Sequence, residues 1–409
     1  MQKFVRDNIE ILMEHTPKTP RMCVSFFFRN QKREKYFGVN SLLVRLLLQG
    51  TKKYTALELA EKFERECIDV SCKAKQDYTK ISLVFLNEDF NLAMELVSDI
   101  ILNSTFESID KEIFKIKGET ISELDAPRTK LSDCFIKTIF KEHPYSSTLT
   151  RILEDIDKIA KEDVVDAHKT MLNSPKAIAV AGDIKDEDKI LDYFEKNFSF
   201  MKNSVSNDEI EDMFKSDITE DETVFISKND AQQAQIIQGA LIESFNNSDL
   251  CAKYAVLNNI LGSSGLSSRL FVNLRDKQGL AYTVRSQYET MLHSAVFSLY
   301  IATAPKNIQK SLDGFYEELK KLADFKVTDK ELKGAKENIS GRIKYFTQNN
   351  SQIVSLKGYN YIMGLGLDYS DKFLEKINKV TADDVISAAK NIISLPKTNV
   401  ILAPDEYKI

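Results

Sequence analysis

The sequence feature that most constrains the fold is an order of elements that occurs twice. In each half, short apolar runs typical of strands come first, and segments with apolar residues at helical spacing follow. The first half begins with strand-like runs such as 22–28 and closes on the apolar run 177–181. In the second half, 234–242 and 295–302 precede the helical segments, and 399–402 takes the position of 177–181. This repetition predicts two α+β domains of similar architecture.

An acidic segment separates the two halves. Between Asn203 and Glu222, eight of twenty residues are Asp or Glu and only one is Lys, a composition typical of a solvated linker. A chain of 409 residues is also long for one domain. We therefore predict an N-terminal domain over 1–202, an acidic linker over 203–222 and a C-terminal domain over 223–409.

Composition narrows the classes of function. The 56 Lys and Arg against 61 Asp and Glu give a net charge of −5, which argues against a nucleic-acid partner. The longest apolar stretch, 42–48, is broken by Arg45 and is too short for a membrane span, and residues 1–8 carry charge where a signal peptide is apolar. Five cysteines without a CxxC are expected to be small buried residues. The sequence thus predicts a cytoplasmic chain without a membrane partner.

Few residues could form a self-sufficient catalytic centre. The chain has four histidines, and no two stand at the i, i+4 spacing of a helical zinc pair. No G-x-S-x-G or phosphate-binding glycine loop occurs. A Ser–His–Asp or Cys–His system stays open, because its members need only meet in space. The histidines are His15, His143, His168 and His293.

The densest motif runs from Gly262 to Tyr282, with the sequence GSSGLSSRLFVNLRDKQGLAY. Its pattern predicts a loop and then a short helix that buries Leu266, Leu270 and Leu274. Gly279 is placed to end this helix, and a strand is expected from residue 280.

This segment closely resembles the C-terminal-domain signature of the pitrilysin/insulinase family of zinc metallopeptidases (inverzincins, which include the mitochondrial processing peptidases and bacterial two-chain forms). Further stretches resemble the family in the family's order, so the resemblance covers nearly the whole chain. It implies two similar domains, each a mostly antiparallel sheet packed by helices. The further stretches are Gly50-Thr51-Lys52-Lys53, His143-Pro144-Tyr145, Val180-Ala181-Gly182-Asp183 and residues 235–239.

The resemblance fails at the zinc site. The family carries H-x-x-E-H on the helix before the Gly-Thr turn, and these positions fall on Ser41, Val44 and Arg45. The spacing keeps all three on one helix face. However, Ser is a poor zinc ligand, Val cannot act as a base, and the Arg guanidinium has no lone pair to offer. We expect no catalytic residue and no bound metal in this chain.

Two glutamates match the family's further acidic pair. Glu112 and Glu119 are seven residues apart, on one face of a predicted helix, and Glu119 corresponds to the third zinc ligand. One carboxylate does not make a zinc site. The alternative for both residues is the solvated face of a Lys/Glu-rich helix.

Arg275 and Tyr282 match an Arg–Tyr pair which, by resemblance, faces the zinc site and hydrogen-bonds the bound peptide backbone. The chemistry suits this substrate-binding role, because Arg offers a rigid fork of donors and Tyr a hydroxyl. The alternative is an Arg paired with Asp276 or Glu289, and a core Tyr.

In two-chain members of the family, one subunit supplies H-x-x-E-H and the other the Arg–Tyr pair. The resemblance therefore implies a non-catalytic, substrate-binding subunit of a heterodimeric metallopeptidase acting on peptides, with no cofactor of its own. Zinc and the catalytic Glu are expected in a partner subunit, and peptidase activity only with that partner. The alternative is an inert scaffolding subunit of a larger complex, and an autonomous hydrolase with a new nucleophile ranks below both.

Overall fold

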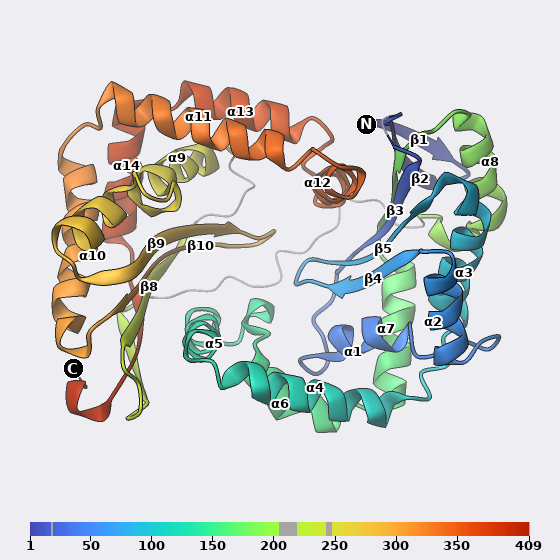
Figure 1. The fold of residues 1–409 in the computed structure, drawn as a ribbon, viewed down its shortest axis with the longest axis horizontal. Helices are drawn as coiled ribbons and strands as arrows, with labels where there is room; N and C mark the ends of the chain where they lie inside the picture. The colour runs from blue at the N-terminus through green and yellow to red at the C-terminus, as the bar shows by residue number, and fades with distance from the viewer. Residues whose placement is uncertain (18, 204–218, 243–247, 409) are drawn as a thin grey trace. The chain divides into compact units, whose positions relative to one another are not determined.

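The computed structural model describes the whole chain except residues 18, 204–218, 243–247 and 409. The described residues form two units, each built around its own sheet (Figure 1). Unit 1 comprises Met1–Thr120, Leu149–Glu211 and Lys344–Tyr369, and unit 2 comprises Ile121–Thr148, Asp212–Ile343 and Ser370–Ile409. The predicted α+β class with two similar domains is confirmed.

The sheet of unit 1 has the strand order β1-β2-β6-β3-β5-β4 in the described residues, and only the β2–β6 pair is parallel. Its central strand β3 pairs with β5 from Arg21 opposite Leu86 to Arg29 opposite Tyr78. The strand β1 was not predicted from the sequence. The strands are β1 (Gln2–Arg6), β2 (Ile9–His15), β3 (Arg21–Arg29), β4 (Asp69–Ala74), β5 (Tyr78–Leu86) and β6 (Lys176–Gly182).

Alternation along β3 sends its side chains to two different cores. Val24 and Phe26 face a large cluster formed with helices α1, α2, α3, α7 and α8, whereas Phe27 faces α12. A Cβ on Gly358 of α12 would lie 2.2 Å from the Phe27 ring, so only glycine permits this approach. The helices are α1 (Val39–Leu46), α2 (Ala56–Arg65), α3 (Phe90–Asn103), α4 (Ile109–Leu124), α6 (Leu149–Asp155), α7 (Lys161–Asn173), α8 (Glu187–Asn197) and α12 (Asn350–Ile362).

In the part of unit 2 that the structure describes, the sheet has the order β7-β11-β8-β10-β9, and β7–β11 is its only parallel pair. Helices α9, α10 and α14 cover one face, and α5 covers the other. The elements are α5 (Pro127–Phe140), β7 (Glu222–Ser227), β8 (Ala234–Ile242), α9 (Ser248–Asn258), β9 (Ala281–Thr290), β10 (Ala295–Thr303), α10 (Ile308–Asp324), α11 (Asp329–Tyr345), α13 (Tyr369–Lys379), α14 (Ala382–Ser394) and β11 (Thr398–Ala403).

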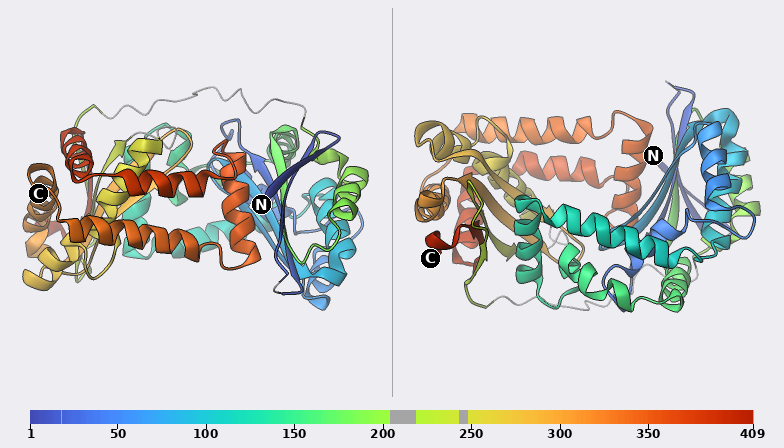
Figure 2. Two further views of the ribbon diagram at one scale, coloured as in Figure 1. Left: turned by 90° about the horizontal axis from the view of Figure 1, so that it is seen from above. Right: turned by 60° about the horizontal axis from the view of Figure 1, so that its bottom comes forward.

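Two short π-helices and several 3₁₀ helices complete the fold. The π-helix η5 runs into the start of the predicted signature segment, and the π-helix η6 lies within that segment. Beside them, α11 runs along α13 (Figure 2), where Lys336 Nζ donates to the Asn378 carbonyl at 2.8 Å. The elements are η5 (Asn259–Ser263) and η6 (Phe271–Lys277), with 3₁₀ turns at Asn87–Asp89, Pro144–Ser146, Ile156–Lys158, Ser199–Met201, Pro305–Asn307 and Asp405–Tyr407.

Each sheet thus receives one covering helix from the other half of the sequence. Helix α5 precedes the acidic segment but packs on β8 and β11, with a Gly239 Cβ position only 2.5 Å from Phe135. Helix α12 follows the acidic segment but packs on β3 and β6. Most of the predicted linker, residues 204–218, lies outside the described residues.

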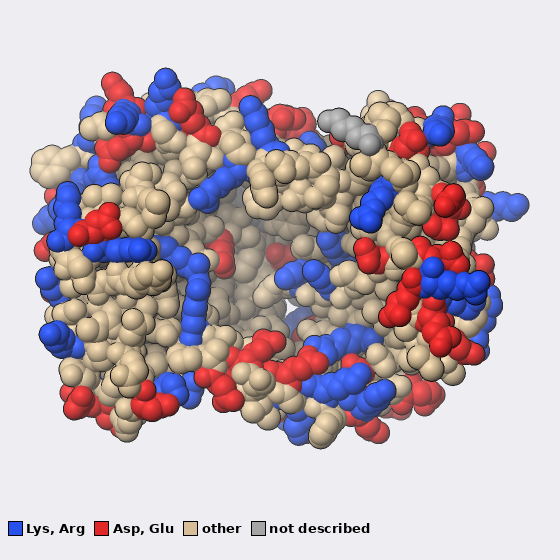
Figure 3. Space-filling view, in the orientation of Figure 1, with Lys and Arg blue, Asp and Glu red and all other residues tan. Residues whose placement is uncertain are grey.

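The surface mixes charges of both signs. On the face shown in Figure 3, Lys and Arg side chains are interspersed with Asp and Glu. Within the described residues, no helix combines the length and apolar character needed to cross a membrane. Of the cysteines expected to be buried, Cys23 and Cys251 are buried, but the expectation was wrong for Cys67, which is exposed at a positive φ after α2.

Candidate functional site

The helix that carries the degenerate zinc motif begins at a specific cap. Gly38 adopts φ +100°, and both Glu34 carboxylate oxygens accept backbone N–H bonds, from Gly38 at 2.9 Å and Asn40 at 3.1 Å. Burial raises the pKa of Glu34, and these two hydrogen bonds oppose the rise. Helix α1 then buries Leu42, Leu43 and Leu46 in the core. This packing fixes the face that carries positions 41, 44 and 45.

Arg45 forms an ion pair with Glu119 of α4, both in unit 1. The pair joins two positions that the resemblance assigns to zinc ligands. Arg45 holds the pKa of the Glu119 carboxyl below its usual range, chiefly through their hydrogen bond. The negative charge of Glu119 is therefore neutralised by the Arg45 guanidinium.

These residues do not fit a zinc ion. Val44 is only 5% exposed and offers no donor atom, and Arg45 brings a fixed positive charge. Across the part of the chain that the structure describes, no group of three or more His, Cys, Asp or Glu side chains could hold a metal ion.

Glu112 lies two turns before Glu119 on α4. Its side chain is 3% exposed and forms an ion pair with Lys115, with 2.5 Å between Lys115 Nζ and a Glu112 carboxylate oxygen. The solvated-face alternative is therefore wrong for Glu112. The Glu119 side chain is about half exposed, as that alternative expected.

Arg275 lies between two aromatic rings of unit 2. Its guanidinium carbon is 4.5 Å from the centroid of Phe271, one turn earlier on η6, and 4.7 Å from that of Tyr282 at the start of β9. Gly279, at φ +60°, makes the turn between η6 and β9, and its N–H donates to the Arg275 carbonyl at 3.0 Å. The helix end predicted at Gly279 is confirmed.

The exposure of this stack separates it from the core. Tyr282 is 76% exposed, so it is not a core tyrosine. In the described residues, neither Asp276 nor Glu289 forms an ion pair with Arg275. A guanidinium that contacts two aromatic rings keeps its planar fork of N–H donors, and the Tyr hydroxyl adds a further donor or acceptor. Such an arrangement suits carbonyl or oxyanion oxygens.

Phe271 was not predicted to belong to this stack, and the nearby Leu266 was predicted wrongly. Phe271 stands four residues before Arg275, a spacing that brings two side chains together on a helix and could have identified it. Leu266 was predicted to be buried, but it is 74% exposed because it lies in the turn after Gly265, before the helix begins. Leu270 and Leu274 are buried as predicted.

The His-Pro-Tyr segment holds a local structure in unit 2. His143 Nδ1 accepts the Tyr145 N–H at 3.0 Å, and the Tyr145 hydroxyl accepts the His293 N–H at 3.0 Å. The motif therefore ties the segment after α5 to the β9–β10 hairpin.

Two family models match this chain. The model described as Insulinase (Peptidase family M16) matches residues 29–151, and that described as Peptidase M16 inactive domain matches residues 158–339. The chain belongs to peptidase family M16. It is a member without H-x-x-E-H anywhere in its sequence.

Relatives of this M16 chain span nearly its full length. It is 26% identical over 99% of its length to an uncharacterized zinc protease of Rickettsia felis, covering 97% of that protein. It is 24% identical to the uncharacterized zinc protease YmxG of Bacillus subtilis, with 98% and 97% covered.

Solved structures share the fold of this chain. A peptidase M16 inactive domain from Pseudomonas fluorescens superposes with a TM-score of 0.87 at 20% identity, covering 98% of this chain and 97% of that one. A protease from Helicobacter pylori gives a TM-score of 0.85 at 20% identity, with 98% and 99% covered.

Proposed function

We propose that this M16 chain is the non-catalytic, substrate-binding subunit of a heterodimeric metallopeptidase that acts on peptides. One observation carries the proposal: Arg275 is held between Phe271 and Tyr282 at an exposed site. The residues at the zinc-motif positions support it, because they cannot ligate a metal ion. In this proposal zinc belongs to the partner subunit, and the complex is cytoplasmic.

The role assigned to the pair follows from its donors. A peptide carbonyl gains negative charge as it is attacked, and a preorganised guanidinium and hydroxyl stabilise that charge more than they stabilise the ground state. The two rings limit the motion of the guanidinium, so little conformational freedom is lost when it binds. Both features favour a pair that acts on the bound peptide.

The test combines this chain with an M16 subunit that carries H-x-x-E-H. Each chain alone and the mixture are assayed with fluorogenic peptides, and the mixture alone is expected to be active. Arg275→Ala and Tyr282→Phe should each lower activity by about 10²–10³-fold, the typical cost of one lost transition-state donor. A loss mainly in kcat assigns the contact to the transition state, and a loss mainly in KM assigns it to general substrate holding.

Matched controls use Arg65→Ala and Tyr316→Phe, since both side chains are exposed and lie outside the stack. They should leave activity unchanged. Full activity in both stack variants, with the complex intact, would contradict the proposal and favour the inert scaffold. Activity of this chain alone would contradict it as well.

A further inference from the structure

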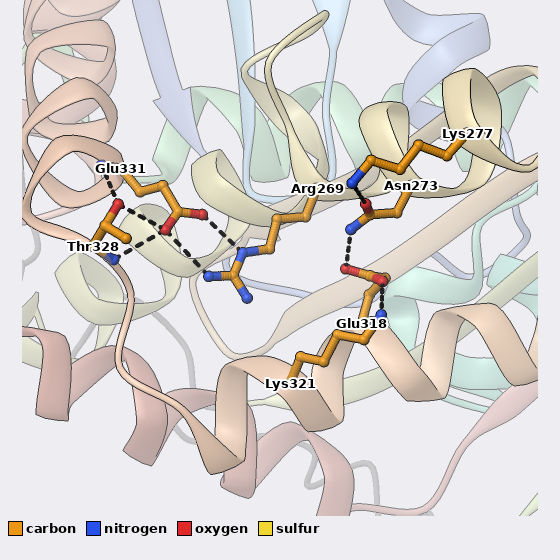
Figure 4. Close-up of polar contacts among 7 residues, drawn as sticks. All are labelled: Arg269, Asn273, Lys277, Glu318, Lys321, Thr328 and Glu331. Carbon is orange, nitrogen blue, oxygen red and sulfur yellow. Dashed lines mark hydrogen bonds and ion pairs between the residues drawn. The ribbon is translucent and has the colours of Figure 1, made fainter.

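A polar network joins η6 to α10 (Figure 4). Asn273 Nδ2 donates to a Glu318 carboxylate oxygen at 2.8 Å, and Lys321 Nζ donates to the other at 2.6 Å. Lys277 Nζ completes the chain by donating to Asn273 Oδ1 at 3.1 Å. Glu318 is 1% exposed, so its carboxylate depends on these partners rather than on water.

Helix α10 contacts η6 at two points on one face. A Cβ on Gly314 would lie 2.7 Å from Leu274, so the two helices approach closely there. Glu318 follows Gly314 by four residues and bonds Asn273, the neighbour of Leu274. One contact is apolar and the other is a directed hydrogen bond. Together they fix the rotation of η6 about its own axis.

A second anchor holds the residues before η6. Arg269 donates to both carboxylate oxygens of Glu331, at 2.9 and 3.3 Å. Glu331 also accepts the Thr328 N–H at 3.0 Å in the first turn of α11 (Figure 4). Further along α11, Arg342 donates to the Ser263 carbonyl at 2.6 Å. Helix α11 therefore fixes the start of the signature segment, and α10 fixes its rotation.

The spacing on η6 links this network to the stack. Phe271 and Arg275 are four residues apart and share the stacked side, whereas Asn273, two residues from each, points to the other side. We propose that Asn273, held by Glu318, is a positioning residue that keeps Arg275 stacked on Tyr282. The assignment rests on the proposed function for its biological role, but the positioning itself is a property of this chain alone.

The test uses the absence of tryptophan from the chain. Tyr282→Trp introduces a single tryptophan at the stack, which is excited selectively over the tyrosines, and acrylamide quenching reports how much of the indole the Arg275 guanidinium covers. Adding Arg275→Ala gives the uncovered reference. Asn273→Ala and Glu318→Ala, each in the Tyr282→Trp chain, should move the quenching constant at least halfway to that reference.

Two further variants separate positioning from general loosening. Glu318→Gln keeps an acceptor for Asn273 and should retain the parental quenching constant. Asn399→Ala removes an amide hydrogen bond to Gln238 elsewhere in unit 2 and should do the same. Thermal melting identifies the folded variants, and if Asn273→Ala does not fold, the contrast between Glu318→Gln and Glu318→Ala decides.

Unchanged quenching in folded Asn273→Ala and Glu318→Ala would overturn the positioning role, as would an equal rise in Asn399→Ala. In an active complex, Asn273→Ala should lower kcat but add nothing to Arg275→Ala, because both act through one side chain. If no complex is active, the proposed function fails while the quenching result still stands. The two outcomes are therefore distinguishable.

Discussion

At the scale of single residues, Arg45 changes the chemistry of the site that corresponds to the family's zinc site. In the family's motif this position belongs to a metal ligand, whereas here a guanidinium pairs with Glu119. The protein supplies a positive charge of its own to the carboxylate. Both side chains are partly exposed, so the pair adds little to stability and matters chiefly by occupying the acidic position.

The pair predicts a pH dependence with a definite sign. The folded-state pKa of Glu119 lies below its ordinary value of 4.5, so the pairing contributes stability at neutral pH. That contribution is lost as pH falls below the ordinary value and through the lowered one. Arg45→Ala should return the Glu119 pKa toward 4.5, measured by carboxyl NMR titration. An unchanged titration would contradict the pairing, and Arg65→Ala is the control.

Restoring the zinc motif by substitution should fail. Ser41→His, Val44→Glu and Arg45→His together place a carboxylate at position 44, where the native side chain is only 5% exposed. We expect the free energy of unfolding to fall by about 1–3 kcal/mol. Zinc after dialysis should stay well below one ion per chain, because the supporting hydrogen bonds are missing.

The double variant Ser41→His with Arg45→His serves as the control for the buried carboxylate. It should be more stable than the triple variant. A triple variant with parental stability and one zinc per chain, measured by metal analysis and denaturant unfolding, would contradict this prediction.

The sequence predicted some features of the site and not others. The Arg275–Tyr282 spacing and the loss of the zinc ligands can be read directly from motifs. Sequence spacing alone does not define the Arg45–Glu119 contact, which joins two helices, but the resemblance assigns both positions to one zinc site and so already implied that they lie close together. Leu266 was misplaced because helical periodicity extended the helix back to residue 266, whereas residues 266–268 form a turn after Gly265, whose φ is +93°.

At the scale of elements, close packing makes Gly358 critical. Gly358→Ala should destabilise the protein by about 1–3 kcal/mol, because the added methyl would lie 2.2 Å from the Phe27 ring. Gly118→Ala on α4 is a matched control, since nothing lies within 4 Å of its Cβ position. That control should stabilise by about 0.5–1 kcal/mol. Equal effects in denaturant unfolding would contradict the packing argument.

Most strands and helices were predictable, but their partners were not. Periodicity identified β3, β8 and β10 because each has alternating or continuous apolar residues. Helix α12 was not among the segments predicted from the sequence, and the pattern within a helix cannot show which sheet it covers. That choice depends on the room beside Gly358, which is a property of the folded packing.

At the scale of the whole molecule, the exchanged helices predict that the halves depend on each other. A fragment of residues 1–202 lacks α12, so the face that carries Phe27 is uncovered. We expect this fragment to bind a hydrophobic dye and to melt without cooperativity. Coexpression with residues 203–409 should restore cooperative melting, and a fragment that melts cooperatively alone would contradict the prediction.

The positions of α5 and α12 in the sequence also determine when each sheet is covered during synthesis. Strands β3 and β5 leave the ribosome long before α12, which is encoded near the end of the chain. At translation rates of roughly 5–20 residues per second, the Phe27 face waits tens of seconds for its cover. Helix α5 in turn precedes the sheet that it covers, and β11 of that sheet is made after α12. Until their covering helices are in place, both sheet faces are exposed apolar surface of the kind that chaperones cover.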